Sequence, residues 1–170
     1  MTRRLLDRLF DAAAYLAAFF MVGTLVMVLV AIVGRLLDVF VPGTDAYAGY
    51  CMAASGFLAL AHTLKRGEHI RVSLLLEHAS PRARRALELW SLSIATILAA
   101  AFAWYSVRLA VQSWQFNDVS TANDATPLWI PQLAMAVGTI VLLVAFVDEW
   151  ILEWRGARRP AAPAEALHYE

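Results

Sequence analysis

Residues 12–34 read AAAYLAAFFMVGTLVMVLVAIVG, a run of 23 residues without Asp, Glu, Lys or Arg. Three more charge-free runs follow it, at residues 46–64, 89–107 and 125–147. A helix rises about 1.5 Å per residue, so crossing a hydrocarbon core of about 30 Å takes roughly 20 residues. A bilayer offers no water to backbone polar groups, so each run must be helical. The sequence therefore predicts an all-α integral membrane protein with four transmembrane helices.

The composition agrees with a membrane location. Hydrophobic residues make up 61% of the chain and charged residues 16%, whereas soluble domains average about 45–50% and 25%. A soluble bundle of four helices would need charged stripes facing water, and a membrane barrel would need alternating strands of about ten residues. The sequence shows neither pattern, so we favour membrane-spanning helices over both. The zero net charge argues against nucleic-acid binding, and a single cysteine excludes an internal disulfide framework.

The breaks between the runs define the organisation of the chain. We expect one membrane domain over residues 1–155, with helices at about 12–34, 46–64, 81–116 and 125–150. Ser80 and Pro81 form a helix start, since serine caps and proline fits the first turn. The run at 12–34 is longer than the apolar part of a signal peptide, about 7–15 residues, so we interpret it as a retained helix. Residues 156–170 are expected to form a disordered cytoplasmic tail.

Between the second and third helices lies GEHIRVSLLLEH, residues 67–78. This stretch is too short and too charged to cross a bilayer. Its alternation of apolar and charged residues is typical of a segment lying in the membrane interface. We therefore predict an interfacial segment between helices two and three.

The basic residues predict the orientation. Twelve of the 14 lysines and arginines precede the first run, lie between the second and third, or follow the fourth. Lysine and arginine resist translocation, so these segments and both termini are expected in the cytoplasm. The two connections expected on the outer side carry six charged residues that are candidates for contact with a partner: Arg35, Asp38, Asp45, Arg108, Asp118 and Asp124.

The membrane runs carry no ionisable Asp, Glu, Lys or Arg, although such groups usually mark ion or solute pathways. No catalytic constellation is visible either, so we expect neither an enzyme nor a complete carrier. An alternative is a haem- or quinone-linked anchor of a redox complex. Haem binding between helices requires paired axial ligands, and of the predicted helices only the second carries a histidine, His62.

Two stretches carry a family resemblance: ALAHTLKRGEHIRVSLL at residues 59–75, and TPLWIPQL at 126–133 followed by Gly138. They resemble the DctQ-like small membrane subunit of tripartite ATP-independent periplasmic (TRAP) transporters. The resemblance implies a non-catalytic scaffold without a cofactor, partnered by a large membrane subunit and a periplasmic substrate-binding protein. It also implies secondary uptake of organic acids across a bacterial inner membrane, driven by a sodium gradient. The six charged residues on the outer side would then be candidates for docking the periplasmic binding protein.

The resemblance further implies roles for two groups of residues. The first group would anchor the interfacial segment at the cytoplasmic side, in contact with membrane lipid: His69, Ile70, Arg71 and Val72. The second would shape the periplasmic entrance of the fourth helix: Pro127, Trp129 and Pro131.

Overall fold

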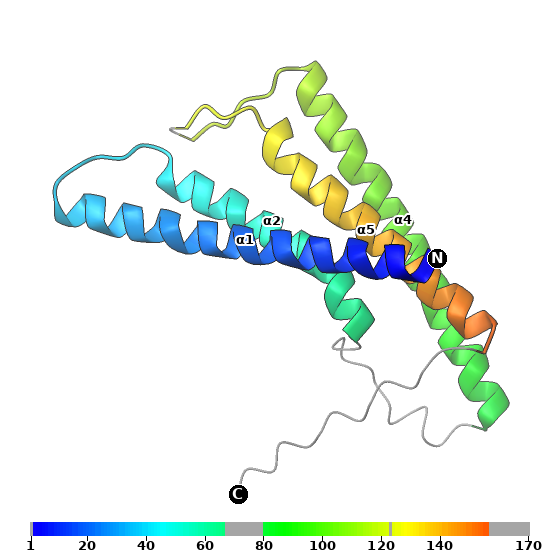
Figure 1. The fold of residues 1–170 in the computed structure, drawn as a ribbon. Coiled ribbons are helices and arrows are strands. Elements are labelled where there is room, and N and C mark those ends of the chain that lie inside the picture. The colour runs from blue at the N-terminus through cyan, green and yellow to red at the C-terminus, as the bar shows by residue number, and fades with distance from the viewer. Residues whose placement is uncertain (1, 67–79, 123, 157–170) are drawn as a thin grey trace, which may run out of the picture.

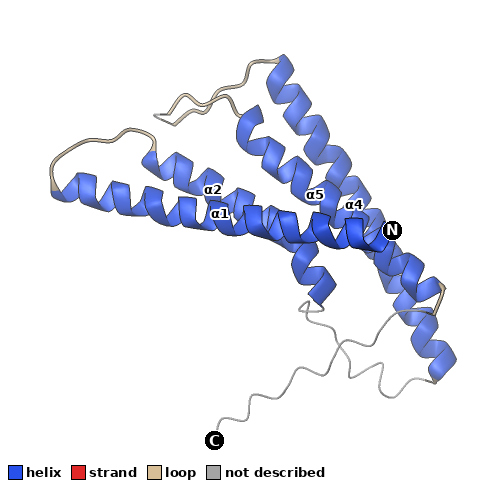
Figure 2. Ribbon diagram, in the orientation of Figure 1, coloured by secondary structure: helices blue, strands red, loops and turns tan. Residues whose placement is uncertain are grey.

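A computed structural model of the chain describes residues 2–66, 80–122 and 124–156. In this part of the chain the regular structure is helical: α1 (Thr2–Leu36), α2 (Thr44–Arg66), α4 (Pro81–Gln115) and α5 (Trp129–Trp154) (Figure 2). One isolated antiparallel bridge pairs Val119 with Pro127. The predicted all-α class is confirmed. The predicted interfacial segment and the predicted disordered tail lie outside the described residues.

Three of the described helices are long and apolar enough to cross a membrane: α1 over Leu5–Leu36, α4 over Arg82–Gln115, and the whole of α5. Helix α2 does not reach this level because small and polar residues, among them Ser55, Gly56 and His62, dilute its apolar character. A fourth crossing by α2 therefore stays a prediction. Small residues suit a helix that packs closely against others, because they let two backbones approach.

Helices α1 and α4 end in the same way. After α1, Asp38 adopts a left-handed backbone with φ 52°, and the amide of Val39 donates to the carbonyl of Gly34 at 2.9 Å. After α4, Asn117 also has φ 52°, and the amide of Asp118 donates to the carbonyl of Ser113 at 3.0 Å. Aspartate and asparagine tolerate this conformation better than other residues with a Cβ. In each case a carbonyl in the last turn of the helix accepts a hydrogen bond from a residue that follows the helix.

The helix starts bear out one expectation and correct another. Helix α4 begins at Pro81, and the hydroxyl of Ser80 accepts a hydrogen bond from the amide of Ala83 at 3.4 Å. Helix α5 begins at Trp129, so the expected start at residue 125 was wrong. The reason is local: Ala125 has φ 47°, which a right-handed helix excludes. Pro131 then falls in the first turn, where its missing N–H breaks no helical hydrogen bond.

The four described helices form two antiparallel hairpins, α1–α2 and α4–α5 (Figure 1). They meet along α2 and α5, so the lateral order of the helices is α1, α2, α5, α4, with α1 and α4 on the outer flanks. We call the end that carries connections 37–43 and 116–128 the loop end. The opposite end carries the start of α1 and the end of α5, and we call it the terminal end.

Small residues bring α5 close to both neighbours. On α4 the buried side chains facing the interior are Leu92, Ala99, Ala103, Ser106, Ala110 and Ser113. Between α2 and α5, a Cβ built on Gly138 would lie 2.6 Å from the carbonyl carbon and oxygen of Phe57, so the two backbones are in contact there. In lipid, where apolar burial drives helix association weakly, such close packing is the main attraction between helices.

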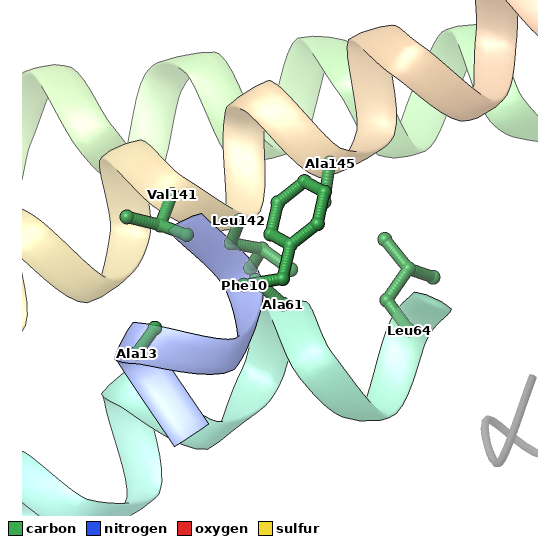
Figure 3. Close-up of a cluster of buried hydrophobic side chains, with 7 residues drawn as sticks. All are labelled: Phe10, Ala13, Ala61, Leu64, Val141, Leu142 and Ala145. Carbon is green, nitrogen blue, oxygen red and sulfur yellow. The ribbon is translucent and has the colours of Figure 1, made fainter. Parts of the chain in front are cut away.

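One buried cluster joins the two hairpins. It contains Phe10, Ala13, Ala61, Leu64, Val141, Leu142 and Ala145, from α1, α2 and α5 (Figure 3). The ring of Phe10 reaches from α1 across to α5, where it lies beside Ala145 (Figure 3). Alanines on α2 and α5 leave the space that this ring fills.

Candidate functional site at the loop end

A partly open cavity of about 560 Å³ lies at the loop end, between the last turns of α1 and the first turn of α2. Its apolar wall includes Val30, Ala31 and Phe40. Three of the predicted periplasmic candidates, Arg35, Asp38 and Asp45, line it together. The structure therefore gathers charges of both signs beside apolar side chains.

The connection 116–128 crosses from α4 to the start of α2, and we call it the strap. Backbone hydrogen bonds from Ser120 to Thr126 (2.8 Å) and from Leu128 to Asp118 (2.9 Å) hold it as an antiparallel turn. Its tip rests on α2, where the hydroxyl of Tyr50 donates to Oδ2 of Asp124 at 3.1 Å. The hydroxyls of Thr126 and Tyr47 lie 3.2 Å apart. The strap thus ties the two hairpins together at the loop end.

Gly43 makes the contact between strap and α2 possible. Its φ of 80° is a conformation that residues with a Cβ rarely adopt, and a Cβ there would lie 2.8 Å from Cβ of Asp124. A glycine is therefore required for two independent reasons. Sequence reasoning missed this residue, because the contact joins positions far apart in the chain.

Asp124 takes part in the contact between the strap and α2, where its carboxylate accepts the hydrogen bond from Tyr50. The nearby hydroxyl of Ser120, the largest contribution, and those of Thr126 and Tyr50 favour the ionised carboxylate, so the pKa of Asp124 lies below its ordinary value of 3.8. Partial desolvation acts in the opposite direction without reversing the shift. Its carboxylate serves the fold of the loop end, which makes it a poor candidate for docking a partner.

The remaining sequence candidates are dispersed. Arg108, near the end of α4, and Asp118, in the strap, are both exposed to the surroundings. Pro127 belongs to the strap, whereas Trp129 and Pro131 lie in the first turn of α5. The structure does not bring these residues into the cavity. His69, Ile70, Arg71 and Val72 lie outside the described residues.

At the terminal end, sequence reasoning missed a charged cluster. Lys65, near the end of α2, pairs with Asp148 on α5 and lies 3.6 Å from Glu149. Its ammonium also lies 5.2 Å from the centre of the Phe10 ring. On the same side, Nδ1 of His62 lies 3.9 Å from Asp11 of α1. The signal was present as a basic and an acidic residue, each directly bounding a charge-free run.

Within residues 2–66, 80–122 and 124–156, no group of three or more His, Cys, Asp or Glu side chains is arranged to hold a metal ion. The histidine on α2 faces a carboxylate of α1. The haem-anchor alternative receives no support from this arrangement.

One family model matches the chain. It is described as tripartite ATP-independent periplasmic transporters, DctQ component, and it matches residues 24–156. The match covers most of the sequence and includes α2, α4 and α5 entirely. No curated protein matches the chain.

Proposed function

The chain belongs to the DctQ component family of tripartite ATP-independent periplasmic transporters, and from this membership we propose that it is a non-catalytic scaffold for transport. The family supplies the small membrane component of these transporters, which work with a large membrane subunit and a substrate-binding protein. Our proposal adds that this chain supports the large, sodium-coupled subunit and helps to dock the binding protein. The transported solutes would be organic acids, taken up across a bacterial inner membrane.

The observation that carries the scaffold role is the position of the charges. The first three charge-free runs lie within α1, α2 and α4, and the fourth lies within α5 from Trp129 onward. The Lys65 cluster and the cavity lie at opposite ends of the hairpins. Ion and solute pathways usually need ionisable groups within the membrane. A chain whose charges stay at its two ends is suited to support a pathway in another subunit.

The outer flanks offer apolar surface for that support. Exposed side chains on α1 include Phe19, Leu25 and Leu29, and on α4 they include Ile97, Leu98 and Trp104. The order α1, α2, α5, α4 leaves both flanks accessible from the side. We propose that the large subunit covers one of these flanks and that lipid covers the other, with both termini in the cytoplasm.

Co-purification tests the scaffold proposal. The chain and a large TRAP subunit are produced together in one cell, and a tag on this chain is used to isolate the complex in mild detergent. We expect both subunits to elute together and to take up an organic acid in liposomes only when the binding protein and a sodium gradient are supplied. Uptake by this chain alone in liposomes would overturn the proposal.

The docking part of the proposal rests on Arg108 and Asp118, which are exposed at the loop end. Reversing their charges with Arg108→Glu and Asp118→Lys is expected to raise the concentration of binding protein needed for half-maximal uptake, because rim charges mainly set association rates. Arg82→Glu, which changes an arginine that is also exposed but lies at the far end of α4, is the matched control. Equal uptake curves for all three variants would remove the docking role.

A further inference from the structure

The cavity at the loop end has features that suit lipid binding, a role separate from transport. We propose that it binds the headgroup of a zwitterionic phospholipid that carries a free ammonium group, such as phosphatidylethanolamine. The proposal requires that α1 spans the membrane, and it does not depend on any role in transport.

The surroundings of the cavity place it at the depth of lipid headgroups. Leu36 and Phe40 are 78% and 79% exposed, and their neighbours Leu37 and Val39 are also exposed. In water this would be an apolar patch of the kind that proteins rarely leave uncovered. These residues follow directly on the candidate span that ends at Leu36, where a chain leaves the hydrocarbon core. Lipid at the boundary between headgroups and acyl chains would cover them.

The charges of the cavity match both ends of the headgroup. The described residues offer Arg35, Asp38 and Asp45 no ion pair and no side-chain hydrogen bond. A guanidinium binds a phosphate through paired, charge-assisted hydrogen bonds, and carboxylates accept from an ammonium. Two carboxylates against one guanidinium give the cavity a net negative charge, which disfavours a purely anionic lipid.

The size and walls of the cavity fit the same ligand. Its volume of about 560 Å³ lies within the range of small-molecule sites, about 300–1,000 Å³. Val30 and Ala31 continue the apolar wall from the cavity along α1. The acyl chains of a bound lipid can follow this exposed flank of α1 into the membrane while the headgroup stays among the charges.

Native mass spectrometry of the full-length chain in detergent tests the proposal. The probes are dioleoyl phosphatidylethanolamine, dioleoyl phosphatidylglycerol and free phosphoethanolamine. We expect the ethanolamine lipid to be retained roughly tenfold more than the glycerol lipid, about the effect of one charge-assisted hydrogen bond. Arg35→Gln should weaken both lipids, whereas the double variant Asp38→Asn/Asp45→Asn should remove the preference between them. Arg35→Lys should restore part of the binding.

Arg108→Gln is the matched control, because Arg108 is an exposed arginine at the loop end that does not line the cavity. It should retain lipid as the unaltered chain does. Helical circular dichroism and gel filtration identify variants that fail to fold. Equal retention of the two lipids by the unaltered chain would overturn the proposal. Tight binding of free phosphoethanolamine would also overturn it, because the ligand would then be a soluble molecule. The proposal would fail as well if Arg35→Gln weakened only the binding of the large subunit and left lipid retention unchanged.

Discussion

At the residue scale, Gly138 lies at a close approach between the backbones of the two hairpins. No side chain fits there, because a Cβ would meet backbone atoms of Phe57 that cannot move independently of α2. Gly56, one residue earlier on α2, has no atom within 4 Å of the position of a Cβ. These two glycines therefore separate the effect of close packing from the effect of replacing a helical glycine.

We predict that Gly138→Ala lowers the free energy of unfolding by about 1–3 kcal/mol, the usual cost of overpacking a close contact. Gly56→Ala should be neutral or slightly stabilising, because alanine favours helix where space is free. Titration with SDS in mixed micelles measures both. The prediction is wrong if the two variants unfold at the same SDS fraction.

Lys65 is the second residue whose role depends on its surroundings. It is partly buried between two carboxylates of α5, whereas the pair of Arg84 and Glu88 (3.2 Å) lies on the outside of α4. Coulomb attraction is stronger where water is partly excluded, and removing one partner leaves charge without compensation. Exposed pairs one helical turn apart contribute little.

We predict that Lys65→Met costs about 1–3 kcal/mol of stability, the range for a hydrogen-bonded charge that loses its partner. Arg84→Met should cost under about 0.5 kcal/mol, as for exposed pairs. Chemical unfolding of the two variants in the same detergent gives the comparison. Similar losses would mean that the Lys65 cluster is solvated as well as the surface pair.

At the scale of elements, the strap shows how a connection of 13 residues can align two hairpins. Its antiparallel turn places Asp124 against Tyr50 and Gly43 on the neighbouring hairpin. A carboxylate with a lowered pKa binds its partners more strongly when ionised. It therefore adds stability at pH values above 3.8, and this stability is lost as the pH falls through the lower pKa of the folded state.

We predict that the unaltered chain melts at a higher temperature than Asp124→Asn at neutral pH, because the ionised carboxylate accepts the hydrogen bond from Tyr50 more strongly and is favoured by the nearby hydroxyls. The difference should narrow below pH 3.8 and vanish once Asp124 is protonated in the folded protein. Thermal melts in detergent over a pH series check this. Asp118→Asn, which changes an exposed carboxylate of the same strap, should show no such convergence.

At the scale of the whole molecule, stability depends on the contact between the two hairpins along α2 and α5, which we call the seam. Helices α1 and α4 have few or no contacts with the opposite hairpin, so α2 and α5 carry most of the association. Phe10 is an exception, because it reaches from α1 into the shared cluster and is only 3% exposed. Phe19, on the same helix, is 69% exposed and faces away from this cluster.

We predict that Phe10→Ala destabilises the protein by about 3 kcal/mol through the cavity that it leaves. Phe19→Ala should change the unfolding free energy by less than about 1 kcal/mol, because this ring is not packed in the core. SDS unfolding of both variants is the measurement. A larger loss for Phe19→Ala would show that the outer flank of α1, rather than the seam, stabilises the isolated chain.

The sequence by itself determined the helices. Charge-free runs of sufficient length must be helical in a bilayer, and Ser80 with Pro81 marks the start of α4 correctly. The family also followed from local motifs, and the family match agrees. Of the candidate site, the sequence indicated that Arg35, Asp38 and Asp45 belong to one end, because short connections keep neighbouring residues together.

The tertiary structure alone decided which helices are neighbours and which charges are used internally. Nearly uniform apolar helices carry no polar stripe to orient them, so their pairing depends on shape, as at Gly138 and Phe57. Asp124 looked like a free surface charge until Tyr50, 74 residues earlier, was found to donate to it. Lys65 and Asp148, 83 residues apart, are joined for the same reason. Contacts across such distances arise only when the packed helices bring the partners together. The sequence placed Lys65 and Asp148 at the ends of charge-free runs, but it did not indicate that they pair with each other.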